Sequence, residues 1–396
     1  MNLATGIFFH WLGGLASASF YIPYRGVRRW SWETYWIVGG LFSWVIAPSV
    51  LASLLVPNLY GLIGDAPISS LVWSYTFGVL WGIGGLTFGL TMRYLGIALG
   101  MAVALGFCAA FGTLMPPIFD GKFGDLFVSA SGLTVLAGVL ACLVGIAISG
   151  AAGMSKEAEM SPEAKAVAVK EFDFKRGMIV AVFAGVMSSC FAYGLAAGKP
   201  LGEITKRALE SSGGSLLWQN LPVLVVVLWG GFTTNFFWCI ALNIRNRSSH
   251  EYLNTPRSRI SEMEAAEGVM ISAAPEIVAN REASAHGSSG ASARYEGPAP
   301  LLRNYLLCAV AGVTWYLQFF FYSMGETKMG AYTFSSWTLH MASIIIFSTI
   351  WGIFLNEWRG SSRRTMNLVF LGLLVLVAST IIVGYGSYLG GDAAGH

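Results

Sequence analysis

Charged residues are scarce in this chain and are absent from its long apolar runs. Asp, Glu, Lys and Arg make up 11% of the 396 residues, whereas apolar residues make up 55%. This balance excludes an ordinary water-soluble globular protein. The net charge of +3 gives no basis for nucleic-acid binding, and we expect none.

Cysteine is also rare, and its placement excludes two kinds of site. The five cysteines fall in five different apolar runs, so neither a disulfide framework nor a spaced metal site is visible. We expect packing roles for them and no cofactor. The runs also contain no acid–base pair or nucleophile constellation, which argues against an enzyme. The cysteines are Cys108, Cys142, Cys190, Cys239 and Cys308.

Ten apolar runs follow one another along the chain. Each has about 20 residues or slightly more, enough for a helix to cross a hydrocarbon core of ~30 Å. We therefore predict an all-α membrane protein with ten transmembrane helices. No basic residues precede the first run and no convincing cleavage site follows it, so we expect a retained helix and not a signal peptide. The runs are 3–22, 34–56, 68–92, 94–115, 131–153, 177–198, 221–244, 304–324, 331–355 and 366–389.

Basic residues concentrate in alternate gaps between these runs. The odd-numbered gaps hold 3, 1, 5, 7 and 3 Lys or Arg residues, 19 of the 24 in the chain. Basic loops stay on the cytoplasmic side of a membrane. The pattern predicts that gaps 154–176 and 245–303 are cytoplasmic and that both termini are periplasmic or extracellular.

Five runs lie on each side of the charged gap 154–176. An odd number per half reverses the direction in which the second half enters the membrane, as in an inverted repeat. We predict a first five-helix repeat at 1–153, a cytoplasmic linker at 154–176 and a second repeat at 177–389. Two unrelated bundles remain an alternative. The long cytoplasmic gap 245–303 ends in a segment rich in Ser, Ala and Gly, which we predict to be unstructured.

Small residues and one proline predict local features of the helices. Glycines four apart, as in Gly78–Gly82 and Gly85–Gly89, allow helix backbones to approach closely. Pro48 leaves one carbonyl of the second run without its usual donor and predicts a kink there.

Only two side chains in the ten runs titrate near neutral pH, His10 and His340. Ionisable groups inside a membrane are costly and usually functional. At the helical rise, His10, His340 and Gln318 lie about 10, 13 and 9 Å from the outer ends of their runs. These three polar groups, drawn from both halves, form our predicted substrate site, and the histidines are candidates for carrying a proton. The alternative is that each histidine only bonds a neighbouring helix.

Aromatic residues accompany these polar groups at helical spacing. Trp315, Gln318 and Tyr322 share one face, and Trp337 precedes His340 by three residues. We predict Trp315, Trp337 and Tyr322 as substrate contacts, because indole faces can cover sugar C–H groups while polar groups meet hydroxyls. Lipid-interface belts are the alternative role for such aromatics.

Two further polar residues complete the candidate set. Glu33 precedes the second run at the cytoplasmic side, where a carboxylate can either stabilise the helix start or exchange a proton with the cytoplasm. We predict a role in proton coupling. Asn235, deep in the seventh run, is a further predicted substrate contact.

At several of these positions the chain resembles the L-rhamnose–proton symporters. The resemblance implies the ten-helix fold of the drug/metabolite transporter superfamily in the bacterial inner membrane. It also implies uptake of L-rhamnose, a 6-deoxyhexose, in symport with a proton, so the expected partners are a sugar, a proton and the lipid bilayer. The chain departs from the family in the gap 245–303, which is longer than expected. The segments that carry the resemblance are His10, Trp30–Thr34, Gly89–Gly96, Trp315–Tyr322, Leu339–Met341, Glu357–Trp358 and Arg363–Arg364.

Two other functions remain open from the sequence. One is a transporter of the same fold for another sugar or for an exported metabolite or drug. The other is a membrane-embedded sensor that does not transport.

Overall fold

The structure, a computed structural model, describes residues 3–95, 97–119, 121–159, 173–253, 299–329, 335–355 and 358–393. These residues form helices and connecting turns, and no strand occurs among them. Ten helical stretches in these ranges are long and apolar enough to cross a membrane, which confirms the predicted ten spans and the all-α fold.

The first five spans and the last five are each formed by one helix or by consecutive helices. The first half contains α1 (Leu3–Ser19) with α2 (Tyr21–Tyr24), α3 (Trp32–Leu41) with η1 (Phe42–Ile46) and α4 (Ala47–Leu55), α6 (Ile68–Leu95), α7 (Ile97–Phe119) and α8 (Ala130–Ala158). The second half contains α10 (Phe174–Ala197), α12 (Leu221–Asn246), α14 (Leu301–Glu326), α15 (Ser335–Phe354) and α16 (Arg363–Ala393).

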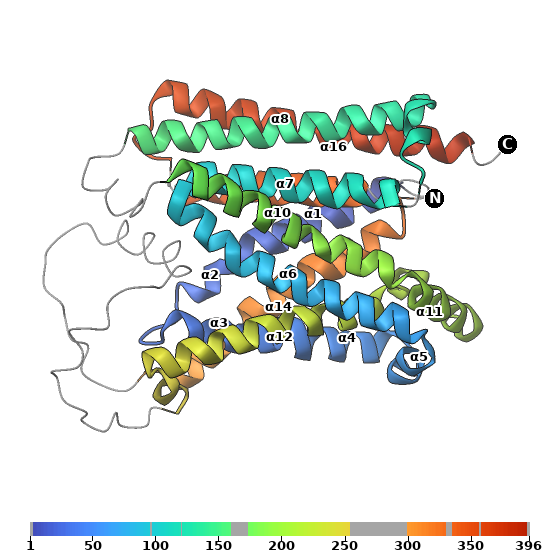
Figure 1. Cartoon of the computed structure of the whole chain (residues 1–396), viewed down its shortest axis with the longest axis horizontal. Helices are drawn as coiled ribbons and strands as arrows, with labels where there is room; N and C mark the ends of the chain where they lie inside the picture. Colours follow the sequence, from blue (N-terminus) through green and yellow to red (C-terminus); the bar gives the residue numbers. More distant parts are fainter. Residues whose placement is uncertain are drawn as a thin grey trace, which may run out of the picture.

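Two short helices lie in gaps where the sequence analysis predicted none. They are α5 (Leu59–Asp65) and α11 (Lys199–Ser212). The apolar side chains of α11 are few, but Leu201 and Leu209 are buried and hold it against the bundle. Both short helices lie at the same end of the molecule as the start of α1 and the end of α16 (Figure 1).

The contacts of α6 and α7 resemble the contacts of α14 and α15. α6 contacts α10 and α12, whereas α14 contacts α1 and α3. α7 also contacts α10, and α15 contacts α1. α8 and α16 lie side by side along their lengths as a separate pair (Figure 1).

Glu159, the residue after α8, helps to cap the start of α16. The Ser362 hydroxyl accepts the backbone N–H of Thr365 at 3.2 Å, and the Glu159 carboxylate accepts the backbone N–H of Ser362 at 2.8 Å. A carboxylate at a helix start is favourable because it meets unpaired N–H groups and the positive end of the helix dipole. Hydrogen bonds from Ser362 and Thr365 lower the pKa of Glu159.

The second span is widened just before Pro48. Residues Phe42–Ile46 form a π-helical turn, and Pro48 lies in the first turn of α4 that follows it. Proline cannot donate to the carbonyl of Trp44 four residues earlier, so the regular hydrogen-bond ladder is interrupted, and the N–H of Ala47 bonds to the carbonyl of Phe42 five residues earlier. The predicted disturbance at Pro48 therefore takes the form of a π turn.

The predicted close approach of helix backbones is confirmed at Gly78 and Gly82 of α6. A Cβ atom on Gly78 would clash with the backbone carbonyl oxygen of Val227 in α12, and one on Gly82 would lie 2.8 Å from the Cβ of Thr234. By contrast, nothing lies within 4 Å of a Cβ atom built on Gly85.

The long gaps were predicted partly on residues that the structure does not describe. Residues 160–172 and 254–298 lie outside the described ranges. The predicted linker at 154–176 and the predicted unstructured segment at the end of 245–303 therefore remain predictions.

Gly78→Ala should destabilise the protein by about 1–3 kcal/mol, because the added methyl group forces α6 away from α12. Gly85→Ala, on the same helix, is the matched control and should leave the stability unchanged or raise it, since alanine favours helix. Thermal unfolding of the purified protein in detergent measures both. An equal response of the two variants would show that the α6–α12 crossing does not depend on Gly78.

Candidate functional site

The two intramembrane histidines come together in the structure. His10 of α1 and His340 of α15 are both fully buried. Their ring centroids lie 5.3 and 5.2 Å from that of Tyr322 in α14. Both imidazoles therefore lie against the same tyrosine ring. The predicted grouping of His10, His340 and Tyr322 therefore corresponds to one cluster.

Glycine provides the space for both imidazoles. A Cβ atom on Gly13 would lie 3.2 Å from Cε1 of His340, and one on Gly325 would lie 2.8 Å from Cε1 of His10. Each histidine therefore packs on the bare backbone of a neighbouring helix. Gln318 belongs to the same region, because its backbone carbonyl oxygen would lie 2.7 Å from the Cβ position of Gly13.

Neither ring nitrogen of His10 or His340 has a hydrogen-bond partner among the described residues. Leaving a buried polar atom unpaired costs about 1–3 kcal/mol, so proteins rarely keep such atoms without a functional reason. The described contacts therefore do not support the alternative in which each histidine only bonds a neighbouring helix.

Stacked aromatic rings extend this cluster toward the middle of the bundle. Trp337 lies 5.8 Å from Tyr322, and its indole N–H donates to the carbonyl of Cys108 at 3.0 Å, which fixes its orientation. Phe191 stacks on Trp337 at 5.6 Å and on Phe319 at 4.1 Å. The predicted contact Trp337 thus lies beside the histidines.

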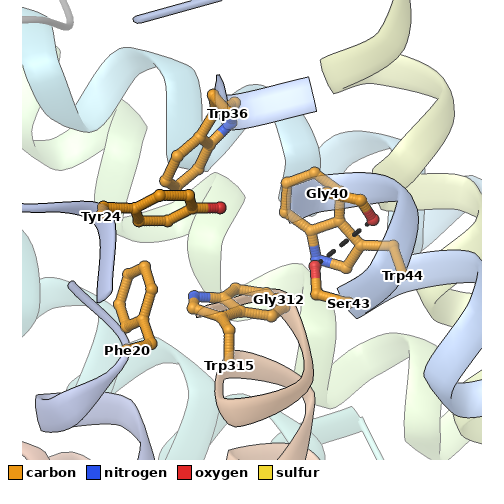
Figure 2. Close-up of a pocket in the computed structure, with 8 residues that line it drawn as sticks. All are labelled: Phe20, Tyr24, Trp36, Gly40, Ser43, Trp44, Gly312 and Trp315. Atoms are coloured by element: carbon orange, nitrogen blue, oxygen red, sulfur yellow. Dashed lines mark hydrogen bonds between the residues drawn. The ribbon is translucent and has the colours of Figure 1, made fainter. Parts of the chain in front are cut away.

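Trp315 lies farther along the same aromatic path and lines a pocket. Its ring centroid is 5.0 Å from that of Phe319, which joins it to the histidine cluster. The pocket holds about 190 Å³ of empty space, part of it open to solvent. Figure 2 shows aromatic rings around this space. The lining residues are Phe20, Tyr24, Trp36, Gly40, Ser43, Trp44, Gly312 and Trp315.

Asn235 is not one of the residues that line this pocket. Its side-chain carbonyl oxygen accepts the indole N–H of Trp36 at 3.2 Å, and its amide donates to the carbonyl of Gly231 at 2.9 Å. Asn235 therefore orients Trp36, which lines the pocket, and its predicted contact with the substrate stays a prediction.

Glu33 lies at the start of α3, away from the histidines. It is only 4% exposed, and it accepts hydrogen bonds from Asn246 at 3.0 Å and from Ser248 at 2.8 Å. Close by, Glu251 accepts the backbone N–H of Ser31 at 2.7 Å. These contacts join the start of α3 to the end of α12.

Several residues of this region were missed by the sequence analysis. Trp36 and Trp44 were not chosen because 14 tryptophans offered no means of ranking them. Phe191 carries no polar group, and only its stacking in the folded chain marks it. Glu326 was left out because the predicted eighth span ended two residues earlier; it accepts a hydrogen bond from Asn220 at 3.1 Å.

Comparison with known proteins decides the family. The family model described as L-rhamnose-proton symport protein (RhaT) matches residues 1–258 and 290–388. This chain belongs to the L-rhamnose-proton symporter family. An L-rhamnose-proton symporter of Cronobacter sakazakii is 35% identical over 387 residues, covering 97% of this chain and 98% of the relative. One of Escherichia coli is 34% identical over 386 residues, with the same coverage of both chains.

The family match confirms one expectation and locates one departure. Members of the symporter family are transporters, so the expectation of a non-enzyme is confirmed. The family model leaves residues 259–289 unmatched, inside the long gap 245–303. That gap is where the sequence analysis found the chain longer than the family pattern.

His10→Leu and His340→Leu should leave the stability unchanged or raise it by about 1–3 kcal/mol, because each removes a buried imidazole without hydrogen-bond partners. The melting temperature of the purified protein in detergent is the measurement. Leu339→Ala provides the contrast, since truncating this fully buried neighbour should cost about 2–5 kcal/mol. A comparable loss in the two histidine variants would assign the imidazoles to packing.

Proposed function

We propose that this protein takes up L-rhamnose together with a proton by alternating access. The observation that carries the proposal is the match, over 97% of the chain, to relatives named L-rhamnose-proton symporters. The histidine cluster and the aromatic pocket supply the chemistry that such a function needs.

The sugar is proposed to bind along the aromatic path from the pocket to the histidines. Indole and phenol faces, among them those of Trp315, Tyr322 and Trp337, cover the C–H groups and the methyl group of a 6-deoxyhexose. The hydroxyl groups meet Gln318 and the unpaired ring nitrogens of His10 and His340. Asn235 supports this arrangement through Trp36.

The same histidines are proposed to couple sugar binding to the proton. A neutral imidazole can accept a sugar hydroxyl proton, whereas a protonated one can only donate. Sugar occupancy and protonation are then thermodynamically linked. Glu33, at the opposite end of the path, is proposed to pass the proton to the cytoplasm. A proton is the coupling ion, and the proposal includes no cofactor.

Two inverted five-helix repeats are the proposed architecture, at 1–153 and 177–389 with the linker at 154–176 between them. The packing supports this arrangement. In this arrangement α1 corresponds to α10, α3 to α12, α6 to α14 and α7 to α15. The contacts correspond as well: α6 contacts α10 and α12 just as α14 contacts α1 and α3, and α7 contacts α10 just as α15 contacts α1. The pair α8 and α16 maps onto itself, as expected for a drug/metabolite transporter with a pseudo-two-fold axis.

The proposed location is the bacterial inner membrane, with both termini in the periplasm and the gaps 154–176 and 245–303 in the cytoplasm. The distribution of basic residues supports this orientation. Cysteines placed at the exposed positions Ser211 and Leu253 test it in intact cells, where an impermeant thiol reagent should label only Ser211→Cys. The five native cysteines are buried and should give little background. Labelling of Leu253→Cys alone would reverse the orientation.

Uptake in proteoliposomes tests the function against its alternatives. A pH gradient, acidic outside, should drive accumulation of L-rhamnose, and L-rhamnose should drive proton entry. A panel of deoxy and ordinary hexoses distinguishes a symporter for another sugar. Binding without accumulation would indicate the sensor, and drug protection without sugar-dependent proton entry would indicate an exporter.

Glu33→Gln should lower accumulation driven by a pH gradient by about tenfold or more, because the amide cannot carry the proton and loses charge-assisted hydrogen bonds. Exchange of labelled for unlabelled sugar at equal pH should remain, since exchange does not require proton release. The two rates are measured on the same proteoliposomes. Equal loss of both would assign Glu33 to structural support of the α3 start.

A further inference from the structure

Glu326 is a second partly buried carboxylate on this path, at the end opposite Glu33. It is the last residue of α14, and its side chain is half-buried. The Asn220 side-chain amide donates to Oε2 of Glu326 at 3.1 Å. The backbone carbonyl of Asn220 accepts the N–H of Leu224 at 3.0 Å and so begins α12. One hydrogen bond therefore joins the end of α14 to the start of α12.

The groups that face Glu326 come from four elements. Asn220 precedes α12 and is neutral, whereas Lys199 begins α11 and acts on the carboxylate as an opposite charge. Tyr322 lies one turn earlier on α14 and contacts both histidines. On α1, His10 packs against Gly325, the residue next to Glu326. Lys328, two residues after Glu326, packs against Gly6 of α1: a Cβ atom on Gly6 would lie 3.0 Å from the Cβ of Lys328.

Glu33 and Glu326 accept hydrogen bonds at opposite ends of α12. Glu33 accepts from Asn246, the last residue of α12, and Glu326 accepts from Asn220, the residue before its start. The histidine cluster lies within one turn of Glu326 along α14. Glu326 thus lies next to the residue that His10 packs against, at the end of the bundle that is proposed to face outward.

We propose that Glu326 is the outer proton acceptor of the symporter and that its ionised form holds the outer end closed. This inference rests on the proposed symport. The ionised carboxylate accepts the hydrogen bond of Asn220, which ties the end of α14 to the start of α12. A proton from the outer solution neutralises the carboxylate and weakens this contact, so the outer end opens to sugar. Transfer of that proton to a neutral ring nitrogen of His10 or His340 restores the carboxylate and the closed contact.

The test compares Glu326→Gln with the wild type in proteoliposomes that have the same pH on both sides, so that the driving force does not change. Uptake of labelled L-rhamnose by exchange should fall as the pH rises in the wild type, by at most about tenfold per pH unit for one proton. In Glu326→Gln the fall over the same range should be at least about threefold smaller, because only the histidines can still bind a proton. Sugar binding, measured by tryptophan fluorescence, should persist. Glu203→Gln, an exposed position on α11, is the control and should keep the wild-type profile.

A second variant keeps the test decisive if Glu326→Gln does not fold. Asn220→Ala leaves the carboxylate in place but removes a hydrogen bond that favours its ionised form. The fall in uptake should then move to higher pH by about one unit. A wild-type pH profile in Glu326→Gln, or an unmoved profile in Asn220→Ala, overturns the role of Glu326. Absence of L-rhamnose-driven proton entry in the wild type instead overturns the proposed symport.

Discussion

The cost of placing polar groups in apolar surroundings shapes this protein at every level. It favours helices, because helices satisfy the backbone hydrogen bonds internally within a membrane. It also restricts the ionisable side chains, so that the ten predicted spans contain His10 and His340 but no carboxylate, lysine or arginine. The two imidazoles lie against Tyr322, and their nitrogens have no hydrogen-bond partner in the part of the chain that the structure describes. Such an arrangement stores a free-energy cost that a sugar hydroxyl or a proton can relieve.

The same cost explains why the carboxylates stand at the ends of the path. Glu33 and Glu326 are both withdrawn from solvent, and each accepts hydrogen bonds from the ends of α12. Between them, aromatic rings fill the path from Trp36 to Trp337 with few polar atoms. Carboxylates thus lie at the two ends of this row of rings, a division that suits the proposed alternating access.

The sequence predicted the helices more completely than the site. The lengths of the spans could be predicted because a helix needs about 20 apolar residues to cross a membrane of fixed thickness. The common level of His10 and His340 was readable because helical rise converts residue number into depth. The hydrogen bond of Asn235 to Trp36 was not predicted, because depth gives no information on which side of a helix meets its neighbours. Phe191 and Trp36 were missed because apolar aromatic residues serve core, belt and site equally well.

Hydropathy, spacing and basic residues thus determined that the chain forms ten membrane-crossing helices, and they singled out the two histidines. These features act locally, since each residue's cost of leaving water is independent of its distant neighbours. Tertiary structure alone decided that both imidazoles contact Tyr322, that Asn235 orients Trp36 and that Glu326 meets Asn220. Those contacts join residues far apart in the chain, and they depend on which helix faces pack together, a choice made by the collective fit of side chains.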